Sequence, residues 1–286
     1  MTARIFSTIV LWGSVIGVTY AFGELGAMWI LALLAAVTLF ETYSLLAHTG
    51  HVANNLSGLL AGSVLVPLAY FIPGSGGDVL AVSAALAAAV LIFLPGDLRG
   101  QYLRRLTPTF FGWLYVPFLL HYFVRILQMD ETPPSPGQLS FGLFFVLWLV
   151  AVAKFSDVGA LLLGKLIGRT KMAPSISPGK TIEGLIGGLG ASVGMGYLLP
   201  WATQTHWPEL VSFPAAGFSP AEAAWLAFPV AIAAVLGDLV ASVLKRLSNT
   251  KDSGSAIPGI GGALDLTDSL ILAAPTGYLA YVLALS

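Results

Sequence analysis

Long apolar stretches separated by short polar breaks run along almost the whole chain. A transmembrane helix needs about 20 mostly apolar residues, within a range of roughly 17 to 25. Stretches of that length predict an all-α integral membrane protein, a polytopic bundle of about nine helices. Proline- and glycine-rich segments mark most of the breaks between them. The expected spans are residues 5–22, 25–47, 54–73, 77–95, 108–127, 139–164, 183–203, 222–243 and 268–285.

The composition favours a membrane protein over a soluble one. Charged residues make up 9% of the 286 residues, whereas soluble domains carry roughly a quarter. A net charge of −1 gives no reason to expect a nucleic-acid partner. The lack of cysteine excludes disulfides and thiolate sites, and it leaves the redox compartment open. The first apolar run could also be a signal peptide, but it is long enough to span and no convincing cleavage site follows.

The basic residues fall almost entirely on one face when the nine expected spans cross the membrane alternately. The other face receives only Arg125, while Lys154 lies inside a span. Cytoplasmic loops carry the excess of lysine and arginine, so we expect the N-terminus in the cytoplasm and the C-terminus outside. The residues expected on the cytoplasmic face are Arg4, Arg99, Arg104, Arg105, Lys165, Arg169, Lys171, Lys180, Lys245, Arg246 and Lys251.

The span expected over residues 183–203 is rich in small side chains. Small residues four apart let helix backbones approach closely. We therefore expect this helix to be buried at the centre of the bundle, with its glycines serving packing. The residues concerned are Gly184, Gly187, Gly188, Gly190, Ala191, Gly194 and Gly196.

A few charged residues lie inside the expected spans. A carboxylate at membrane depth costs at least about 2.5 to 3.5 kcal/mol, so each needs a partner or a function. The acidic candidates are Glu41, Asp157 and Asp238. Lys154 and Asp157 are three residues apart on one helix face, so mutual neutralisation and a functional role are both open.

The C-terminal segment concentrates charge that is scarce elsewhere. Asp238, Ser242 and Lys245 stand at i, i+4 and i+7, which predicts one polar stripe on a helix. Asp265 and Asp268 likewise share a helix face. These two carboxylates could simply cap a helix N-terminus, but two close acids are better accommodated beside a cation. We favour a metal site.

The available ligands indicate which metal this site would hold. Oxygen donors without cysteine favour Mg²⁺ or a similar hard ion, which leaves several coordination positions to phosphate oxygens. Lys245, Arg246 and Lys251 could hold the remaining phosphate charge. The expected ligand is a nucleotide or another polyphosphate that meets a lipid.

A second polar motif precedes the glycine-rich span. Gly179-Lys180-Thr181 suggests a Walker A loop, but that motif requires glycine where this chain has Pro174. We expect instead a rigid loop that delivers Lys180 to a helix start, where anions are favoured; a solvated lysine is the alternative. The four histidines do not cluster at ligand spacing, and no Gly-x-Ser-x-Gly elbow is present.

These C-terminal residues resemble the signature of the phosphatidate cytidylyltransferases, also called CDP-diacylglycerol synthases. That signature reads S-x-x-K-R, four residues, then K-D-x-G-x-x-(L/I/F)-P-x-H-G-G-x-x-D-R-x-D. Upstream, residues 177–184 resemble the family's S-P-x-K-T-x-E-G, and Gly237-Asp238 its G-D; Asp157 and Gly164 match a further motif, D-x-x-A-Y-x-x-G. In the main signature the matching residues are Ser242, Lys245, Arg246, Lys251, Asp252, Gly254, Ile257, Pro258, Gly261, Gly262, Asp265 and Asp268.

The chain departs from these motifs at three positions. Ile260 replaces the histidine before the paired glycines, and Leu266 replaces the arginine after the first aspartate. Leu161 stands where the upstream motif has tyrosine. These differences bear on the identity of the substrate more than on the metal site.

The resemblance implies an Mg²⁺-dependent nucleotidyltransferase that makes CDP-diacylglycerol and pyrophosphate from CTP and phosphatidate, with a second cation left open. It implies Asp238, Asp265 and Asp268 as metal ligands within the catalytic set. Phosphate clamps would be Lys180, Lys245, Arg246 and Lys251, and the groups that orient them would be Asp157, Glu183 and Asp252. Further substrate-binding residues would be Ser177, Thr181, Ser242, Ser253, Gly254, Pro258, Gly261 and Gly262.

The resemblance also suggests a division of labour along the chain. Residues 1–138 would form a scaffold with a lipid entrance, and residues 139–286 would carry the active site. The enzyme would lie in a bacterial inner membrane among its lipids, with its active site facing the cytoplasm and a homodimer left open. The alternatives are a CTP-dependent polyprenol or lipid kinase, a cytidylyltransferase for another lipid phosphate, and a non-catalytic transporter or scaffold.

Overall fold

The computed structural model describes residues 2–53, 55–72, 101–130, 134–135, 137–214, 217–256 and 261–285. Apart from one short hairpin, the regular structure of these residues is helical, which confirms the all-α class. The span expected over residues 77–95 lies outside the described residues, and so do Pro258 and Ile260. In chain order the elements are α1 (Thr2–His48), α2 (Asn55–Phe71), α4 (Gln101–Trp113), the π-helix η1 (Leu114–Phe118), α5 (Tyr122–Leu127), α6 (Phe141–Ile167), β1 (Lys171–Ala173), β2 (Ser177–Thr181), α7 (Ile182–His206), α8 (Pro220–Leu247) and α9 (Ala263–Leu285).

Several of these helices have the length and apolar character of membrane spans, which supports the expected membrane protein. A further apolar helix, α2, is shorter. The count of nine spans and the sides on which the termini lie remain predictions. Within the described residues, six stretches are long enough to cross: Gly13–His48, Arg104–Leu127, Phe141–Ile167, Ile182–His206, Pro220–Leu247 and Ala263–Ala284.

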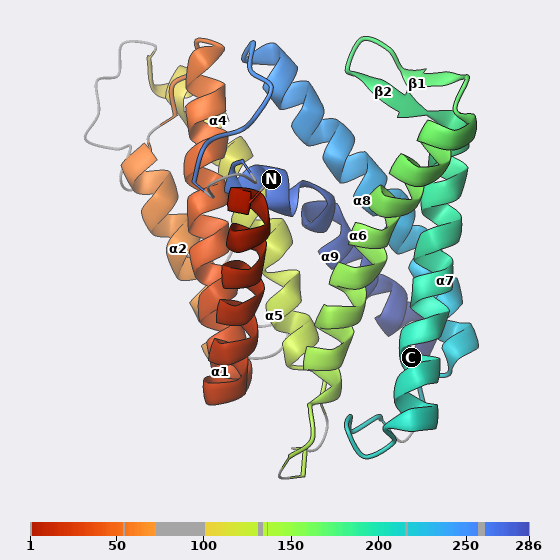
Figure 1. The fold of residues 1–286 in the computed structure, drawn as a ribbon. Helices are drawn as coiled ribbons and strands as arrows, with labels where there is room; N and C mark the ends of the chain where they lie inside the picture. The colour runs from red at the N-terminus through yellow and green to blue at the C-terminus, as the bar shows by residue number, and fades with distance from the viewer. Residues whose placement is uncertain are drawn as a thin grey trace. The chain divides into compact units, whose positions relative to one another are not determined.

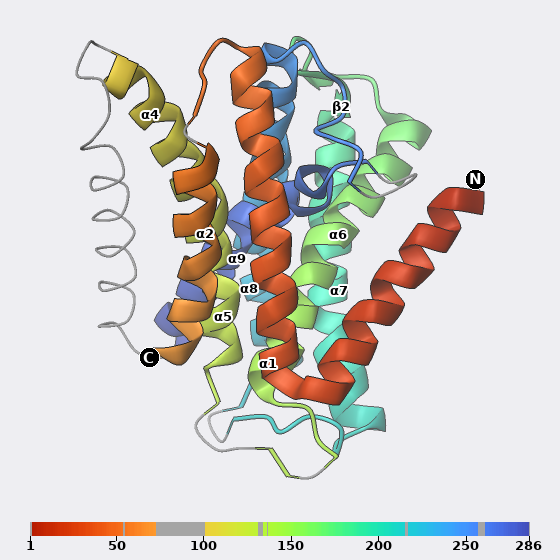
Figure 2. The ribbon, with the colours of Figure 1, turned by 90° about the vertical axis from the view of Figure 1, so that its left-hand side faces the viewer.

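Helix α1 is broken near its middle. Gly23 has φ 59° and ψ −139°, a backbone conformation outside the helical region that glycine adopts without steric cost. Figure 2 shows the resulting sharp bend between the two parts of α1. The break coincides with the boundary that the hydrophobic pattern predicts between residues 22 and 25.

The chain forms two compact units, each discontinuous in sequence. Unit 1 consists of Met1–Arg125 and Val243–Thr267, and unit 2 of Ile126–Ser242 and Asp268–Ser286. Helices α8 and α9 therefore each contribute residues to both units. The sequence predicts a scaffold with a lipid entrance in residues 1–138 and the active site in residues 139–286. This functional division is separate from the two compact units and remains a prediction.

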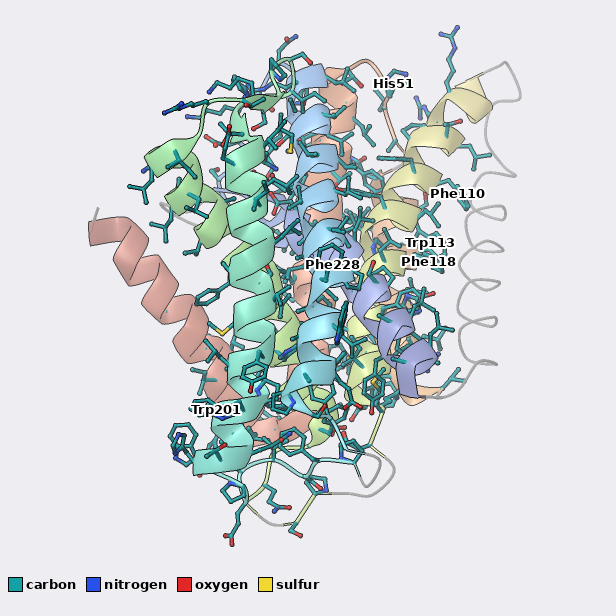
Figure 3. All side chains as sticks on the ribbon, turned by 90° about the vertical axis from the view of Figure 1, so that its right-hand side faces the viewer. His51, Phe110, Trp113, Phe118, Trp201 and Phe228 are labelled. Atoms are coloured by element: carbon teal, nitrogen blue, oxygen red, sulfur yellow. The ribbon has the colours of Figure 1, made fainter. Side chains whose placement is uncertain are left out.

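In unit 1, Tyr43 of α1 anchors the packing of α1 against α2 and α4. Its hydroxyl donates a hydrogen bond to the Thr109 carbonyl oxygen over 2.8 Å, so the buried polar end is satisfied. A Cβ atom at Gly58 or Gly112 would overlap the Tyr43 ring, and glycine is therefore required at both positions. Next to this contact, the rings of Trp113 and Phe118 pack with centroids 5.9 Å apart (Figure 3).

In unit 2, α6 and α7 run side by side at close range (Figure 1). A Cβ atom at Gly159 of α6 would meet the Cβ of Ala191 at 2.5 Å, and one at Gly188 of α7 would meet the Ser156 carbonyl oxygen at 2.6 Å. This confirms that small residues of α7 serve helix packing. The expectation of a fully buried helix is not met around Gly190, where a Cβ would contact nothing within 4 Å.

We expect Gly159→Ala to destabilise the protein, because the added methyl group must push α6 and α7 apart. Overpacking of this kind costs typically about 1 to 3 kcal/mol. Gly190→Ala is the matched control, since its methyl group enters open space and alanine favours a helix over glycine by up to about 1 kcal/mol. Thermal unfolding in detergent measures both. A melting temperature lowered equally by the two substitutions would contradict this account of the helix contact.

Candidate active site

The hairpin of β1 and β2 brings Lys180 to the start of α7. The strands are antiparallel, with Lys171 opposite Thr181 and Ala173 opposite Ser177. Thr181 is the N-cap of α7, and its hydroxyl oxygen accepts a hydrogen bond from the Gly184 amide over 3.1 Å. Where the sequence predicts a loop, the chain therefore forms a β-hairpin that leads directly into α7. Lys180 is the last residue before the N-cap of this helix.

Glu183, in the first turn of α7, secures the base of this hairpin. Its carboxylate accepts hydrogen bonds from the Arg169 amide over 3.1 Å and from the Thr170 hydroxyl over 3.0 Å. The Thr170 amide donates to the same carboxylate over 3.2 Å. Glu183 therefore holds the backbone that leads into β1, and its expected role as an orienting group remains a prediction.

Lys180 forms an ion pair with Asp238 of α8. Its Nζ lies 2.5 Å from Asp238 Oδ2, and the two side chains are 26% and 22% exposed. The Ser242 hydroxyl donates a long hydrogen bond of 3.5 Å to the other oxygen, Oδ1. Asp238 and Ser242 therefore form the beginning of the polar stripe that the sequence predicts on this helix.

Two charged residues of α6 complete this group. Lys154 donates a hydrogen bond of 2.9 Å from Nζ to the Ser269 hydroxyl of α9. The charges of Lys154, Lys180 and Asp238 all act on the carboxylate of Asp157, which lies one turn along α6. We call Lys154, Asp157, Lys180, Asp238 and Ser242 the Asp238 cluster. Lys154 was not assigned to a site from the sequence, although its charge within an apolar span was the available signal.

Gly237 allows α8 and α9 to approach closely beside the Asp238 cluster. A Cβ at this position would collide with the carbonyl oxygen of Asp268. Asp268 is 7% exposed, and its Oδ1 accepts a hydrogen bond from the Ser269 amide over 2.7 Å. The glycine of the Gly237-Asp238 motif thus has a packing reason.

In unit 1, Asp265 is the centre of a second polar group, which we call the Asp265 cluster. Its Oδ1 pairs with Lys245 Nζ over 2.7 Å, and both side chains are less than one-fifth exposed. Its Oδ2 accepts hydrogen bonds from the Ser253 amide over 3.0 Å and from the Gly262 amide over 3.1 Å, and the Ser253 hydroxyl oxygen lies 3.0 Å from the same atom. The cluster comprises Lys245, Ser253, Gly262 and Asp265.

The hydrogen bond from the Gly262 amide shows that Asp265 caps α9. α9 begins at Ala263, so Gly262 is its N-cap and Asp265 its third residue. A side chain at that position that accepts from the N-cap amide forms one half of a capping box. Asp265 therefore caps α9 and, through its other oxygen, holds Lys245. The sequence presented helix capping and a metal site as alternatives for this carboxylate; the structure shows the cap and the lysine partner, and the metal site remains a prediction.

The glycines of the signature fit tightly around these groups. Gly261 has φ 125°, in the left-handed region where a side chain is strained. A Cβ at Gly254 would lie 2.6 Å from Glu41 Oε1, and one at Gly262 would overlap the same carboxylate. Their expected contact with substrate remains a prediction, but the structure gives each a local reason.

The remaining signature residues are more accessible. Arg246, Lys251 and Asp252 are exposed, and Ser177 is half-buried in β2. The roles expected for Arg246 and Lys251 as phosphate clamps, for Asp252 as an orienting group and for Ser177 in substrate binding remain predictions.

The carboxylates suit a hard metal ion by the kind of donor they offer. Among the described residues, however, no three histidine, aspartate or glutamate side chains lie close enough together to hold a metal. Asp238 and Asp265 are each engaged with a lysine instead. The expected magnesium ligand set therefore remains a prediction.

Comparison with known proteins shows which family this chain resembles. The model of the cytidylyltransferase family matches residues 2–284. The chain belongs to this family. A cytidylyltransferase signature was the resemblance expected from residues 242–268, and it is confirmed by a match across nearly the whole chain.

Curated cytidylyltransferase relatives carry a more specific name. Phosphatidate cytidylyltransferase of Synechocystis is 30% identical to this chain over 294 residues, which cover 95% of each protein. The Bacillus subtilis protein of the same name is 32% identical over 60% of this chain and 56% of its own length. The Helicobacter pylori protein of that name is 41% identical over 47% of this chain and 46% of its own length.

Proposed function

We propose that this cytidylyltransferase converts CTP and phosphatidate into CDP-diacylglycerol and pyrophosphate in a membrane. The observation that carries the proposal is the presence of two lysine–aspartate pairs, Lys180–Asp238 and Lys245–Asp265, built from the residues that the family signature specifies. The name shared by the Synechocystis, Bacillus and Helicobacter relatives supports phosphatidate as the acceptor.

The lysines are suited to hold the phosphates of CTP. A lysine ammonium is a compact point charge with three donors, and it binds phosphate without the geometric demands of arginine. The aspartate beside each lysine fixes the position of Nζ before the nucleotide arrives. Less conformational entropy is then lost on binding, which favours the interaction.

The proposed reaction needs positioning more than acid–base chemistry. A phosphate oxygen of phosphatidate attacks the α-phosphorus of CTP, an oxygen–phosphorus bond forms, and the bond to the leaving pyrophosphate breaks. A phosphate monoester is already a nucleophile, so no strong base is required. Lys180 and Lys245 would stabilise the charge that develops on the phosphate oxygens, as in other phosphoryl transfers.

Magnesium is part of the proposal, with a second cation left open. Asp238, Asp265 and Asp268 would hold the ion, because carboxylate oxygens are ligands that Mg²⁺ prefers. When bound, Mg²⁺ would neutralise charge on the nucleotide phosphates. Removing it with EDTA should abolish turnover, and added Mg²⁺ should restore it; full activity in EDTA would contradict this requirement.

The ends of α6 and α7 support a cytoplasmic site in the inner membrane. Basic side chains gather at the hairpin end, where positive-inside topology predicts the cytoplasm. The opposite end of α7 carries exposed Trp201 (Figure 3), and its C-cap is the exposed Trp207; tryptophan is enriched at membrane–water interfaces. The basic residues at the hairpin end are Lys165, Arg169, Lys171 and Lys180.

The test is an assay of purified protein with labelled CTP, Mg²⁺ and a panel of lipids. We expect labelled CDP-diacylglycerol and pyrophosphate with phosphatidate. Release of CDP together with a phosphorylated lipid would indicate a CTP-dependent kinase, and turnover only with another lipid phosphate would change the acceptor. No turnover with any lipid would favour a transporter or scaffold.

A further inference from the structure

A buried glutamate of α1 reaches the Asp265 cluster from the other end of the sequence. Glu41 is 5% exposed, and its Oε2 accepts a hydrogen bond from the Leu264 amide over 2.9 Å and lies 3.0 Å from the Ser253 hydroxyl oxygen. These two partners lie at the two ends of the signature loop, whose described residues are 253–256 and 261–264. Glu41 therefore holds both ends of the loop.

The contact with Leu264 is a helix cap supplied from a distance. Leu264 is the second residue of α9, and the first amides of a helix have no partner within it. The Gly262 amide is satisfied by Asp265, whereas the Leu264 amide is satisfied by Glu41, which lies 223 residues earlier in the sequence.

Ser253 connects Glu41 with Asp265. The Ser253 hydroxyl lies 3.0 Å from Glu41 Oε2 and 3.0 Å from Asp265 Oδ2. Asp265 in turn holds Lys245 over 2.7 Å. If Glu41 moved, Ser253 would move with it. The Asp265 carboxylate and its partner Lys245, which the proposed reaction uses, would then shift as well.

The other oxygen of Glu41 shows that this arrangement is costly. Glu41 Oε1 is buried without a hydrogen-bond partner among the described residues. Burying a polar oxygen without a hydrogen-bond partner is unfavourable. The glycines at positions 254 and 262 leave just enough space for this carboxylate, since a Cβ at either would collide with it. Both glycines are therefore fitted to the Glu41 carboxylate.

We propose that Glu41 is a positioning residue for the cytidylyl transfer, and that it sets the geometry of Asp265 and Lys245 by fixing the signature loop. The inference rests on the proposed function for its kinetic part only. It gives α1 a part in the active site, beyond the scaffold expected of the N-terminal region.

The test compares Glu41→Ala and Glu41→Gln with Thr38→Val. The Thr38 hydroxyl bonds the Thr267 hydroxyl over 3.2 Å, so Thr38→Val removes a different hydrogen bond between α1 and α9 and leaves the loop contacts in place. We expect Glu41→Ala to lower kcat/KM for CTP at least about tenfold, with the KM for phosphatidate changed less than about threefold. Glu41→Gln should recover most of the loss, because an amide oxygen still accepts from Leu264.

Hydrogen exchange of the loop amides provides a readout that needs no substrate. The Leu264 amide should exchange at least about tenfold faster in Glu41→Ala than in the wild type, and it should be unchanged in Thr38→Val. Wild-type exchange in Glu41→Ala, or an equal kinetic loss in Thr38→Val, would overturn the inference. A wild-type protein that makes no CDP-diacylglycerol would instead overturn the proposed function, and the exchange experiment would still test Glu41.

A second variant covers the case in which Glu41→Ala does not fold. Ser253→Ala removes the hydroxyl that contacts Glu41. It should lower kcat/KM for CTP as Glu41→Ala does, again with little change in the KM for phosphatidate. Combining it with Glu41→Ala should lower kcat/KM for CTP by no more than about threefold beyond the worse single variant, because both act through one link. Fully multiplicative losses would show that the two residues act independently and would overturn the link.

Discussion

Asp265→Asn should lower CTP-dependent turnover at least about a hundredfold, the size of effect seen when one preorganised charge-stabilising group is removed from an active site. Asparagine keeps an oxygen that can accept from the Ser253 and Gly262 amides, so the start of α9 should stay formed. The negative charge opposite Lys245 is lost, and the lysine is no longer held in place. Steady-state assays of purified protein in detergent measure the change.

The control for this substitution is Glu209→Gln, which removes a carboxylate from an exposed position outside both clusters. It should leave turnover within about twofold of the wild type, as expected for a surface substitution away from the site. A folded Asp265→Asn protein with wild-type turnover would count against Asp265 as part of the active site. Retained folding is checked by size-exclusion chromatography and thermal unfolding.

Lys180→Met should raise the KM for CTP and lower kcat/KM at least about thirtyfold, because methionine keeps much of the length of the side chain but cannot bind phosphate. The Asp238 carboxylate would also lose its 2.5 Å partner. The unpaired negative charge would then repel the nucleotide phosphates. Initial rates measured over a range of CTP concentrations separate the effects on kcat and KM.

Lys171→Met is the matched control, since Lys171 is exposed on the facing strand of the same hairpin. It alters the net charge equally but removes no contact with Asp238. We expect its kinetic constants to stay within about twofold of the wild type. Equal losses in the two variants would show that overall charge, rather than the Lys180–Asp238 pair, governs CTP binding.

The local features of the site could be predicted from the sequence. The proline-bounded segment before α7 indicated that Lys180 would be delivered to a helix start, and Thr181 provides the cap that this requires. The spacing of Asp238 and Ser242 predicted one polar stripe on α8, and their side chains do interact. These features depend on residues a few positions apart, so helix periodicity and capping rules suffice.

The long-range contacts could not be predicted in the same way. Glu41 was a candidate because of its charge at membrane depth, but its partner Ser253 lies 212 residues away. Lys154 and Ser269 are 115 residues apart, and the pairing of Lys154 with Asp157 on one helix face was the nearer alternative. Without the packing of the helices, hydropathy alone cannot specify which polar groups from different spans will meet.

The discontinuous composition of unit 1 limits how this protein could be divided. Its compact unit includes Val243–Thr267, and Glu41 has its hydrogen-bonding partners in that returning segment. A fragment ending near residue 138 would expose a buried carboxylate, and the complementary fragment would lack the cap on α9. Co-expressed halves would therefore need to reassemble, and separate expression of a minimal catalytic half is a poor strategy for this fold.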